Sequence, residues 1–220
     1  MTQSSWGAIF DWDGVVIDSS DAHCQSWDLL AAEDQRPLPV GFFKKSFGMK
    51  NQKIIPELLR WATAPAEVQR LGDRKEELYR EIIRRDGVRQ IPGTRELLER
   101  LQAAGVPCAV GSSTPRRNIE QALELIGERQ FFQAIVAADD VIHGKPAPDI
   151  FLLAAQRLGL PPARCVVFED AHVGIEAARA GGMKVVGIAS SHPADTLQDA
   201  DRVVQRLDEL SVAELAGLVG

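Results

Sequence analysis

Cysteine is scarce in this sequence, and the few thiols do not suggest a framework. Three occur, Cys24, Cys108 and Cys165, and no two have the close spacing of a zinc ribbon or a redox motif. An odd number of widely spaced cysteines also argues against a disulfide-stapled secreted domain. Cys108 and Cys165 lie in apolar runs, where a thiol acts as a small core residue. We therefore expect reduced thiols in a cytoplasmic setting.

Long apolar segments and an excess of positive charge are missing as well. No apolar run approaches the roughly 18 residues of a membrane span, and the first residues do not read as a secretory signal. Acidic residues outnumber basic ones by 31 to 25, which gives a net charge of −6. Nucleic-acid-binding domains normally carry a basic stripe. We expect neither nucleic acid nor membrane among the partners.

What remains is the composition of an ordinary globular protein. Of the 220 residues, 45% are hydrophobic and 25% are charged. A chain of this mass buries about 70% of the surface that it exposes when unfolded. It can therefore build a core without metal or disulfide staples, as a monomer or a weak homo-oligomer.

The order of the predicted elements indicates a parallel sheet that helices interrupt once. A short buried strand at 8–10 is followed by helical periodicity from about 20 to 86. Strands and helices then alternate, which is typical of an α/β fold with a parallel sheet. The expected strands lie at 106–111, 134–137, 165–168, 184–188 and 202–204, and the expected helices at 94–104, 115–127, 149–158, 172–180 and 207–218.

This pattern predicts two domains. Residues 1–17 and 91–220 would form an α/β core domain, and residues 18–90 an inserted, all-helical cap domain. The crossings near 16–20 and 87–92 are candidate hinges.

The first predicted strand ends in Asp11-Trp12-Asp13-Gly14. Ligands of open parallel sheets bind at the carboxyl ends of the strands. Alternation along the strand places Asp11 and Asp13 on one side and Trp12 on the other. Two clustered carboxylates need a cation or a proton between them, and Gly14 allows a sharp turn. A solvated turn would produce the same four residues.

Two further strand ends carry groups that suit an anion. Residues 111–115, Gly-Ser-Ser-Thr-Pro, would begin a helix with hydroxyls and amides that fit a phosphate, although taken alone they favour plain capping. Lys145 stands between Gly144 and Pro146, and proline biases the preceding residue to an extended conformation. A lysine held in this way can neutralise an oxyanion, whereas most lysines simply lie on the surface.

A fourth strand end carries the adjacent acids Glu169 and Asp170. Mg²⁺ prefers oxygen ligands, usually one or two carboxylates with waters and substrate phosphate. Asp11 and Asp170 could meet such an ion from neighbouring strands. The alternative is an acidic helix N-terminus that the helix dipole favours.

The order of these four segments resembles the haloacid dehalogenase-like (HAD) hydrolase superfamily. Asp-x-Asp-Gly, Ser, Lys-Pro and Glu-Asp match its motifs I to IV, and the resemblance covers nearly the whole chain, cap included. It is strongest to the branch with small helical caps that contains beta-phosphoglucomutase and phosphoglycolate phosphatase-like enzymes. The resemblance implies a Rossmann-like core and a Mg²⁺-dependent phosphatase of small phosphorylated metabolites, a sugar phosphate being one candidate.

The resemblance also implies a role for each motif residue. Asp11 would be the nucleophile that forms an aspartyl-phosphate. Asp13 would be the general acid for the leaving oxygen and then the general base for water. Ser112 would hydrogen-bond the transferring phosphoryl group, and Lys145 would balance its charge.

The implied Mg²⁺ ligands come from the same segments. They are the Asp11 carboxylate, the Asp13 backbone carbonyl and Asp170, with Glu169 as a ligand or just outside the coordination shell. Five residues are candidates for substrate binding: Gly14, Ser113, His23, Lys75 and Arg116. For His23 a half-exposed histidine, and for Lys75 a solvated helix face, are the plain alternatives.

Departures from the family pattern separate a phosphatase from a phosphosugar mutase. Asn51 stands where phosphomutases of this branch have an arginine for a second phosphate, and Thr114-Pro115-Arg116 replaces their Ser-Lys-Asn loop. Arg116 or Lys50 could substitute, so the mutase remains the alternative. A non-catalytic domain that binds phosphorylated ligands is a third reading. A dinucleotide-binding protein is disfavoured, because no GxGxxG follows the first strand.

Overall fold

The computed structural model describes residues 6–46 and 49–220, so residues 1–5 and 47–48 of the predicted domains lie outside the described residues. The chain divides into two compact units. The core unit comprises Met1–Asp18 and Arg89–Gly220, and the cap unit comprises Ser19–Val88.

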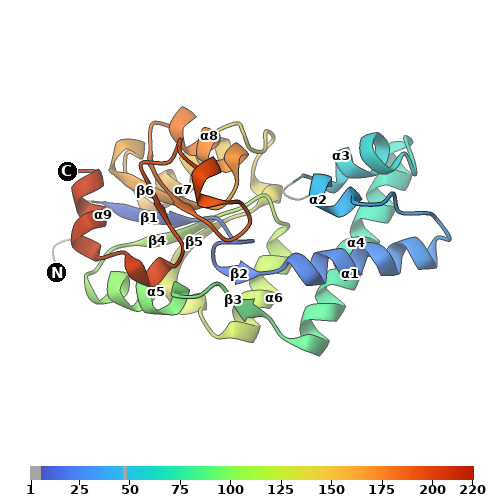
Figure 1. Ribbon diagram of the computed structural model, residues 1–220, viewed down its shortest axis with the longest axis horizontal. Coiled ribbons are helices and arrows are strands. Elements are labelled where there is room, and N and C mark those ends of the chain that lie inside the picture. Colours follow the sequence, from blue (N-terminus) through green and yellow to red (C-terminus); the bar gives the residue numbers. More distant parts are fainter. Residues whose placement is uncertain (1–5, 47–48) are drawn as a thin grey trace. The chain divides into compact units, whose positions relative to one another are not determined.

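A parallel sheet of six strands forms the core unit (Figure 1). Its order is β5-β4-β1-β6-β7-β8, with every neighbouring pair parallel. The strands are β1 (Gly7–Phe10), β4 (Cys108–Gly111), β5 (Phe132–Val136), β6 (Cys165–Glu169), β7 (Lys184–Ile188) and β8 (Arg202–Val204). β1, β4 and β6 are buried along their whole length, because helices cover the sheet; this explains why they read as apolar runs. The predicted α/β fold class is confirmed.

Helices lie on both sides of this sheet. α7 (Asp149–Leu158) and α8 (His172–Ala180) lie on one side and α5 (Thr94–Ala103) on the other (Figure 1). Ile9, Phe151, Val167 and Ile175 belong to the apolar cluster that includes α7 and α8. The remaining helices of the core unit are α6 (Arg116–Ile126), α9 (Val212–Leu218) and the short 3-10 turns Arg129–Phe131, Ala138–Asp140, Pro162–Arg164, Ala194–Thr196 and Leu207–Glu209.

Two short antiparallel strands lie at the predicted crossings. β2 (Ile17–Asp18) pairs with β3 (Arg89–Gln90), and Asp18 accepts a hydrogen bond from Arg89 at 3.0 Å. The sequence did not indicate these strands, because two residues are too few to show a period.

One predicted helix is wrong in its extent. The segment 207–218 is a 3-10 turn followed by α9, not one helix. Ser211 interrupts it as an N-cap: its Oγ accepts from Glu214 N at 3.2 Å, while the Glu214 carboxylate accepts from Ser211 N at 2.9 Å. This reciprocal capping box fixes a new helix start.

Helices build the described part of the cap unit. They are α1 (Ser20–Glu33), α2 (Phe42–Ser46), α3 (Asn51–Lys53), a π-helix (Ile54–Leu59) and α4 (Pro65–Asp86). Trp27 is buried in their apolar core with Leu30, Ile55 and Leu71, and the half-buried Trp61 packs at its edge.

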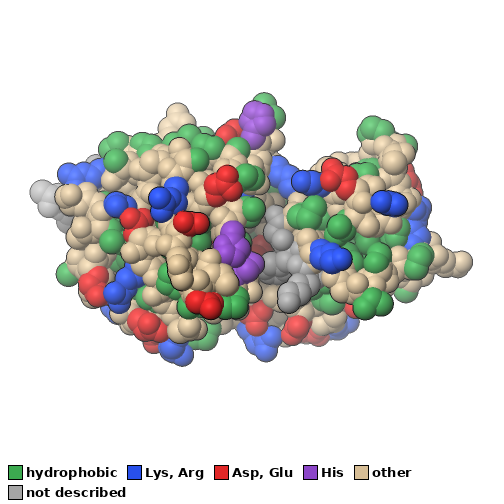
Figure 2. Space-filling model, turned by 45° about the horizontal axis from the view of Figure 1, so that its top comes forward, with side chains coloured by type: hydrophobic (Ala, Val, Ile, Leu, Met, Phe, Trp, Pro, Cys, Tyr) green, Lys and Arg blue, Asp and Glu red, His purple; other side chains and the backbone are tan. Residues whose placement is uncertain are grey.

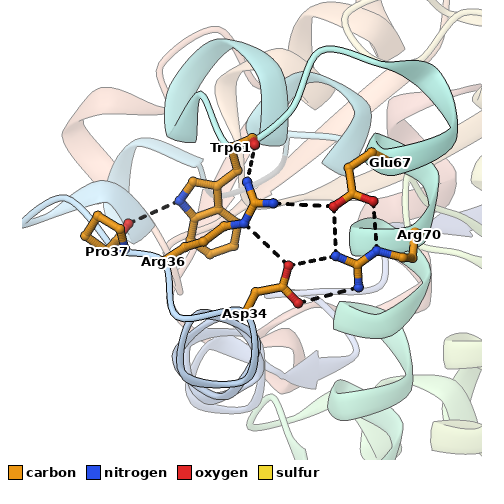
Figure 3. A network of polar contacts seen from close by, with 6 residues as sticks. All are labelled: Asp34, Arg36, Pro37, Trp61, Glu67 and Arg70. Carbon is orange, nitrogen blue, oxygen red and sulfur yellow. Dashed lines mark hydrogen bonds and ion pairs between the residues drawn. The ribbon is translucent and has the colours of Figure 1, made fainter.

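Ion pairs fasten the end of α1 to the start of α4 (Figure 3). Arg70 lies 2.7 Å from Asp34 and 2.8 Å from Glu67, and Arg36 reaches both carboxylates at 3.4 Å. Arg36 also donates to the Trp61 carbonyl. These contacts brace the cap unit from within.

The surface of the described residues carries both acidic and basic side chains on the face that Figure 2 shows. Figure 2 shows acidic and basic side chains interspersed over the core unit on that face. No helix among the described residues is long and apolar enough to cross a bilayer.

Candidate active site

The sheet order brings the predicted motif segments together. Asp11 follows β1, Ser112 follows β4 and Glu169 is the last residue of β6. β1 lies between the other two strands, so their carboxyl ends are neighbours. The ladder continues into the loops, since Asp11 N donates to Phe168 O and Ser112 N donates to Val136 O, both at 2.9 Å.

Lys145 reaches these acids from the loop before α7. Its Nζ lies 2.8 Å from Asp11 Oδ1 and 2.5 Å from Glu169 Oε1. The Phe151 ring lies beneath the ammonium, with the ring centroid 4.6 Å from Nζ. Although burial alone would lower the pKa of Lys145, the two carboxylates raise it, so the side chain stays charged.

Three buried carboxylates gather around that single ammonium. Asp11, Glu169 and Asp170 each offer an oxygen, and these atoms lie within 4.8 Å of one another. Burial raises the pKa of Asp11 from 3.8 to about 7, although Lys145 opposes the rise. Burial also raises the pKa of Asp170, and the neighbouring Glu169 and Asp11 charges add to the effect. The cluster thus favours a proton or a cation, either of which would reduce its negative charge.

This donor set fits a hard divalent cation. The oxygen Asp170 Oδ2 is buried and has no hydrogen-bond partner among the described residues. A buried carboxylate oxygen in that condition is costly unless a ligand satisfies it. All-oxygen carboxylate groups are the ligands that Mg²⁺ prefers, so these residues could hold the expected ion.

Glycine is required where the backbone touches this cluster. Gly14 has a positive φ of +81°, and a Cβ there would lie 2.1 Å from Asp170 Oδ2. A Cβ on Gly174 would lie 1.7 Å from Glu169 Oε1. Gly14, expected as a substrate-binding residue, therefore has a second reason to be glycine, because it admits the Asp170 carboxylate.

Thr114 is a site residue that sequence reasoning missed. Its Oγ1 donates to the carboxylate of the half-buried Asp13, and its backbone N donates to Ser112 Oγ at 3.1 Å. Ser112 Oγ thus accepts a hydrogen bond within its own loop, and the hydroxyl can still donate its proton to another acceptor. Thr114 belongs to the 111–115 segment that the sequence analysis considered, but the sequence did not indicate that it contacts Asp13.

The remaining core candidates are placed differently. Ser113 is half-buried in the same segment. Arg116 Nη2 donates to Asp140 Oδ2 at 2.6 Å and to Ile135 O at 2.9 Å, which fastens α6 to the loop after β5. In this arrangement the guanidinium is committed to protein partners.

The cap candidates His23 and Lys75 contact each other inside the cap unit. Lys75 Nζ lies 2.7 Å from His23 Nδ1 and 3.0 Å from Glu76 Oε1, and Asn51 Nδ2 donates to Glu76 at 2.7 Å. His23 stacks on Tyr79 with ring centroids 4.1 Å apart. Lys75 is only 3% exposed, so the alternative of a solvated helix face is wrong.

Glu76 is the counter-ion that the sequence did not reveal. Burial alone would raise its pKa, but Lys75, His23 and the Asn51 hydrogen bond together lower it. Adjacent residues of opposite charge on a helix give no signal that both are buried.

Comparison with known proteins places this arrangement among hydrolases. A family model described as haloacid dehalogenase-like hydrolase matches residues 7–182. The chain is 43% identical over 96% of its length to 5-amino-6-(5-phospho-D-ribitylamino)uracil phosphatase, chloroplastic, of Arabidopsis thaliana, of which it spans 57%. It is 35% identical to fructose-1-phosphate phosphatase YqaB of Escherichia coli (strain K12), covering 83% of this chain and 95% of that one.

A solved structure shares the fold almost end to end. The crystal structure of beta-phosphoglucomutase from Clostridium difficile matches with a TM-score of 0.84 and 24% identity, covering 98% of this chain and 97% of that one. The superfamily and the branch that the motifs indicated are both confirmed.

Proposed function

Because the chain belongs to the haloacid dehalogenase-like hydrolase family, we propose that it is a Mg²⁺-dependent phosphatase of small phosphorylated metabolites. One observation carries the proposal: Asp11 is buried 2.8 Å from the Lys145 ammonium, beside two further carboxylates with an unsatisfied oxygen. In this proposal residues 1–17 and 91–220 are the catalytic domain and residues 18–90 the cap domain.

Asp11 is the nucleophile of the first step. One of its carboxylate oxygens bonds to phosphorus while the bond from phosphorus to the leaving oxygen breaks. Asp13 gives its proton to that oxygen, and the Thr114 hydroxyl, which donates to Asp13, keeps the carboxyl oriented. The product of this step is an aspartyl-phosphate on Asp11 and a free alcohol.

Hydrolysis of the aspartyl-phosphate is the second step. Asp13, now ionised, takes a proton from a water molecule whose oxygen bonds to phosphorus. The bond to Asp11 breaks, and inorganic phosphate leaves with the carboxylate restored and the Asp13 proton regained. Ser112 donates its hydroxyl to the phosphoryl oxygens, and Lys145 balances their charge.

The acidic cluster supplies the cation site of this proposal. Asp11, Asp170 and the Asp13 carbonyl would hold Mg²⁺, with Glu169 as a ligand or as the group that joins Lys145 to the site. The ion, when bound, neutralises charge on the phosphoryl oxygens.

Phosphorylated sugars and sugar alcohols are the substrate class that we favour. The two phosphatases described above are named for a phosphoribitylamino compound and for fructose 1-phosphate. A mutase would in addition need a free cationic site for a second phosphate. Here Asn51 and Lys75 are engaged with Glu76, and Arg116 with Asp140. Of the two cations that could substitute for the mutase arginine, this leaves Lys50, so these contacts support hydrolysis over isomerisation.

A reducing compartment such as the cytoplasm is also proposed. Cys24, Cys108 and Cys165 are all free thiols, and burial raises the pKa of Cys108 to about 12, which keeps it protonated and unreactive.

The test compares hydrolysis with isomerisation. An aryl phosphate should be hydrolysed with Mg²⁺ by the wild type and not by Asp11→Asn, and wild-type rates in that variant would overturn the nucleophile assignment. With β-glucose 1-phosphate and a trace of glucose 1,6-bisphosphate, we expect little glucose 6-phosphate. Its rapid accumulation without free phosphate would make the protein a mutase.

A further inference from the structure

The segment that follows β7 makes contacts that no motif accounts for. Ser190, Ser191 and His192 lie in the turn and loop after β7, which neighbours β6 in the sheet. Ser190 Oγ donates to Gly14 O at 2.5 Å, and His192 Nδ1 lies 2.9 Å from Asp170 O. This segment therefore bonds to the loop after β1 and to the loop after β6.

Ser191 completes the connection at the side-chain level. A Cβ on Gly14 would lie 2.8 Å from Ser191 Oγ and 2.1 Å from Asp170 Oδ2, so both oxygens converge on the Gly14 backbone. The Ser191 hydroxyl therefore lies beside the Asp170 carboxylate at the Gly14 backbone.

His192 can act in only one way on the Asp170 backbone. A carbonyl oxygen only accepts, so the ring nitrogen Nδ1 carries the proton and donates it. The His172 ring, at the start of α8, meets the His192 ring edge-on with centroids 4.8 Å apart. The imidazole is therefore held from two sides.

We propose that residues 190–192 are a positioning segment. By bonding to the backbone carbonyls of Gly14 and Asp170, the segment holds the adjacent Asp13 carbonyl and the Asp170 carboxylate at the separation required to bind a divalent cation. The proposal rests on the proposed function, because it concerns the same cation. Three buried carboxylates repel one another, and only Lys145 opposes this among the contacts described above. Partners that orient metal ligands typically change metal affinity by 10- to 100-fold when removed.

Direct titration of the metal tests this. We expect Ser190→Ala and His192→Ala, which remove the bonds to Gly14 O and Asp170 O, to weaken Mg²⁺ binding, measured by calorimetry, by about 10-fold or more. Ser190→Thr and His192→Asn keep a hydroxyl and an N–H donor, and they should recover most of the affinity. Thr196→Ala is the matched control, since its hydroxyl bonds only to the local carbonyl of Pro193 among the described contacts.

The thermal unfolding midpoint of each variant in EDTA distinguishes a loss of metal affinity from a general loss of stability. It should fall only slightly in Ser190→Ala and His192→Ala, because each variant loses a single loop hydrogen bond when no cation is bound. Wild-type Mg²⁺ affinity in both alanine variants would overturn the proposal, and so would a loss of affinity that follows a large fall of the midpoint in EDTA. If the wild type binds Mg²⁺ but hydrolyses no phosphate ester, the proposed function fails while this inference stands. If the wild type binds no Mg²⁺, the inference itself fails.

Discussion

Lys145 Nζ lies 2.8 Å from Asp11 Oδ1, which joins a residue at the end of the central strand to a loop far along the chain. Burial raises the pKa of Asp11 to about 7, and the ammonium is the largest influence that holds it down. The proposed nucleophile therefore depends on Lys145 for its charge.

Lys145→Met should shift the acidic limb of the pH–rate profile to higher pH. Without the ammonium, the pKa of Asp11 rises further, so a larger fraction of the nucleophile is protonated at neutral pH. We expect kcat/KM for an aryl phosphate to fall at least 10-fold at pH 7 and to recover partly at higher pH. Lys184→Met is the control, because Lys184 pairs with Asp201 at 2.8 Å on the surface. An unmoved acidic limb would contradict the assignment.

The acidic cluster should make the metal-free protein less stable as pH rises. The pKa of Asp11 is about 7 in the folded state against an ordinary 3.8, so the folded state binds that proton more tightly. The resulting stability is complete below about pH 4 and is lost as pH rises through 7. We expect the unfolding midpoint in EDTA to fall between pH 5 and pH 8, and Mg²⁺ to raise it more at pH 8.

Asp11→Asn gives the matched comparison for that titration. The amide cannot ionise, so this variant should lose part of the pH dependence and be the more stable protein in EDTA at pH 8. For a domain of this size each 1 kcal/mol shifts the midpoint by about 2–4 °C. Equal slopes for the two proteins would show that Asp11 does not titrate in this range.

Lys75 and Glu76 should behave as a coupled pair in the cap unit. Lys75 is 3% and Glu76 8% exposed, and 3.0 Å separates their charged atoms. Removing one member leaves the other charge buried, which typically costs about 3–5 kcal/mol. We expect Lys75→Met and Glu76→Gln each to be strongly destabilising and the double variant to be far less so, as measured by urea unfolding.

An exposed pair on the same helix is the control for this cycle. Arg85 and Asp86 are likewise adjacent on α4 and pair at 2.6 Å on the surface, and such pairs contribute about 0–1 kcal/mol. If the effects of Lys75→Met and Glu76→Gln simply add, the pair is not coupled.

Thr114→Val should slow turnover, because the Asp13 carboxylate loses the hydrogen bond that orients it. The valine keeps the shape of threonine but cannot donate to the Asp13 carboxylate. Because Asp13 serves both proton transfers in the proposed mechanism, we expect kcat to fall roughly 10-fold while KM changes little. Thr114→Ser keeps the hydroxyl and should remain close to wild type. Equal rates for Thr114→Val and wild type would remove Thr114 from the site.

The sequence indicated the fold and the motif residues because both leave local signals. Apolar runs marked the strands, and Asp11, Lys145 and Asp170 each sit where a run or a proline marks a loop. Parallel pairing then forces strand ends to share one edge. What was missed depends on contacts between distant segments: Thr114 with Asp13, and His192 with Asp170. A hydroxyl or an imidazole in a loop does not reveal its partner.

Helix periodicity likewise could not separate a buried charge from a solvated one. Lys75 and Glu76 occupy adjacent helical positions, and each is buried because the other neutralises it and Asn51 holds Glu76. The same two letters on an exposed helix would read identically.

The place of β1 in the sheet has a consequence for the order of biosynthesis. Residues 7–10 leave the ribosome before their partners at 108–111 and 165–169 exist. At about 5–20 residues per second, the strand waits roughly 10–30 s for its second neighbour. During that time β4 can pair with one edge of β1, while the other edge of β1 has no partner from the finished sheet. In the proposed function the cation site includes Asp170, so that site would be complete only late in synthesis.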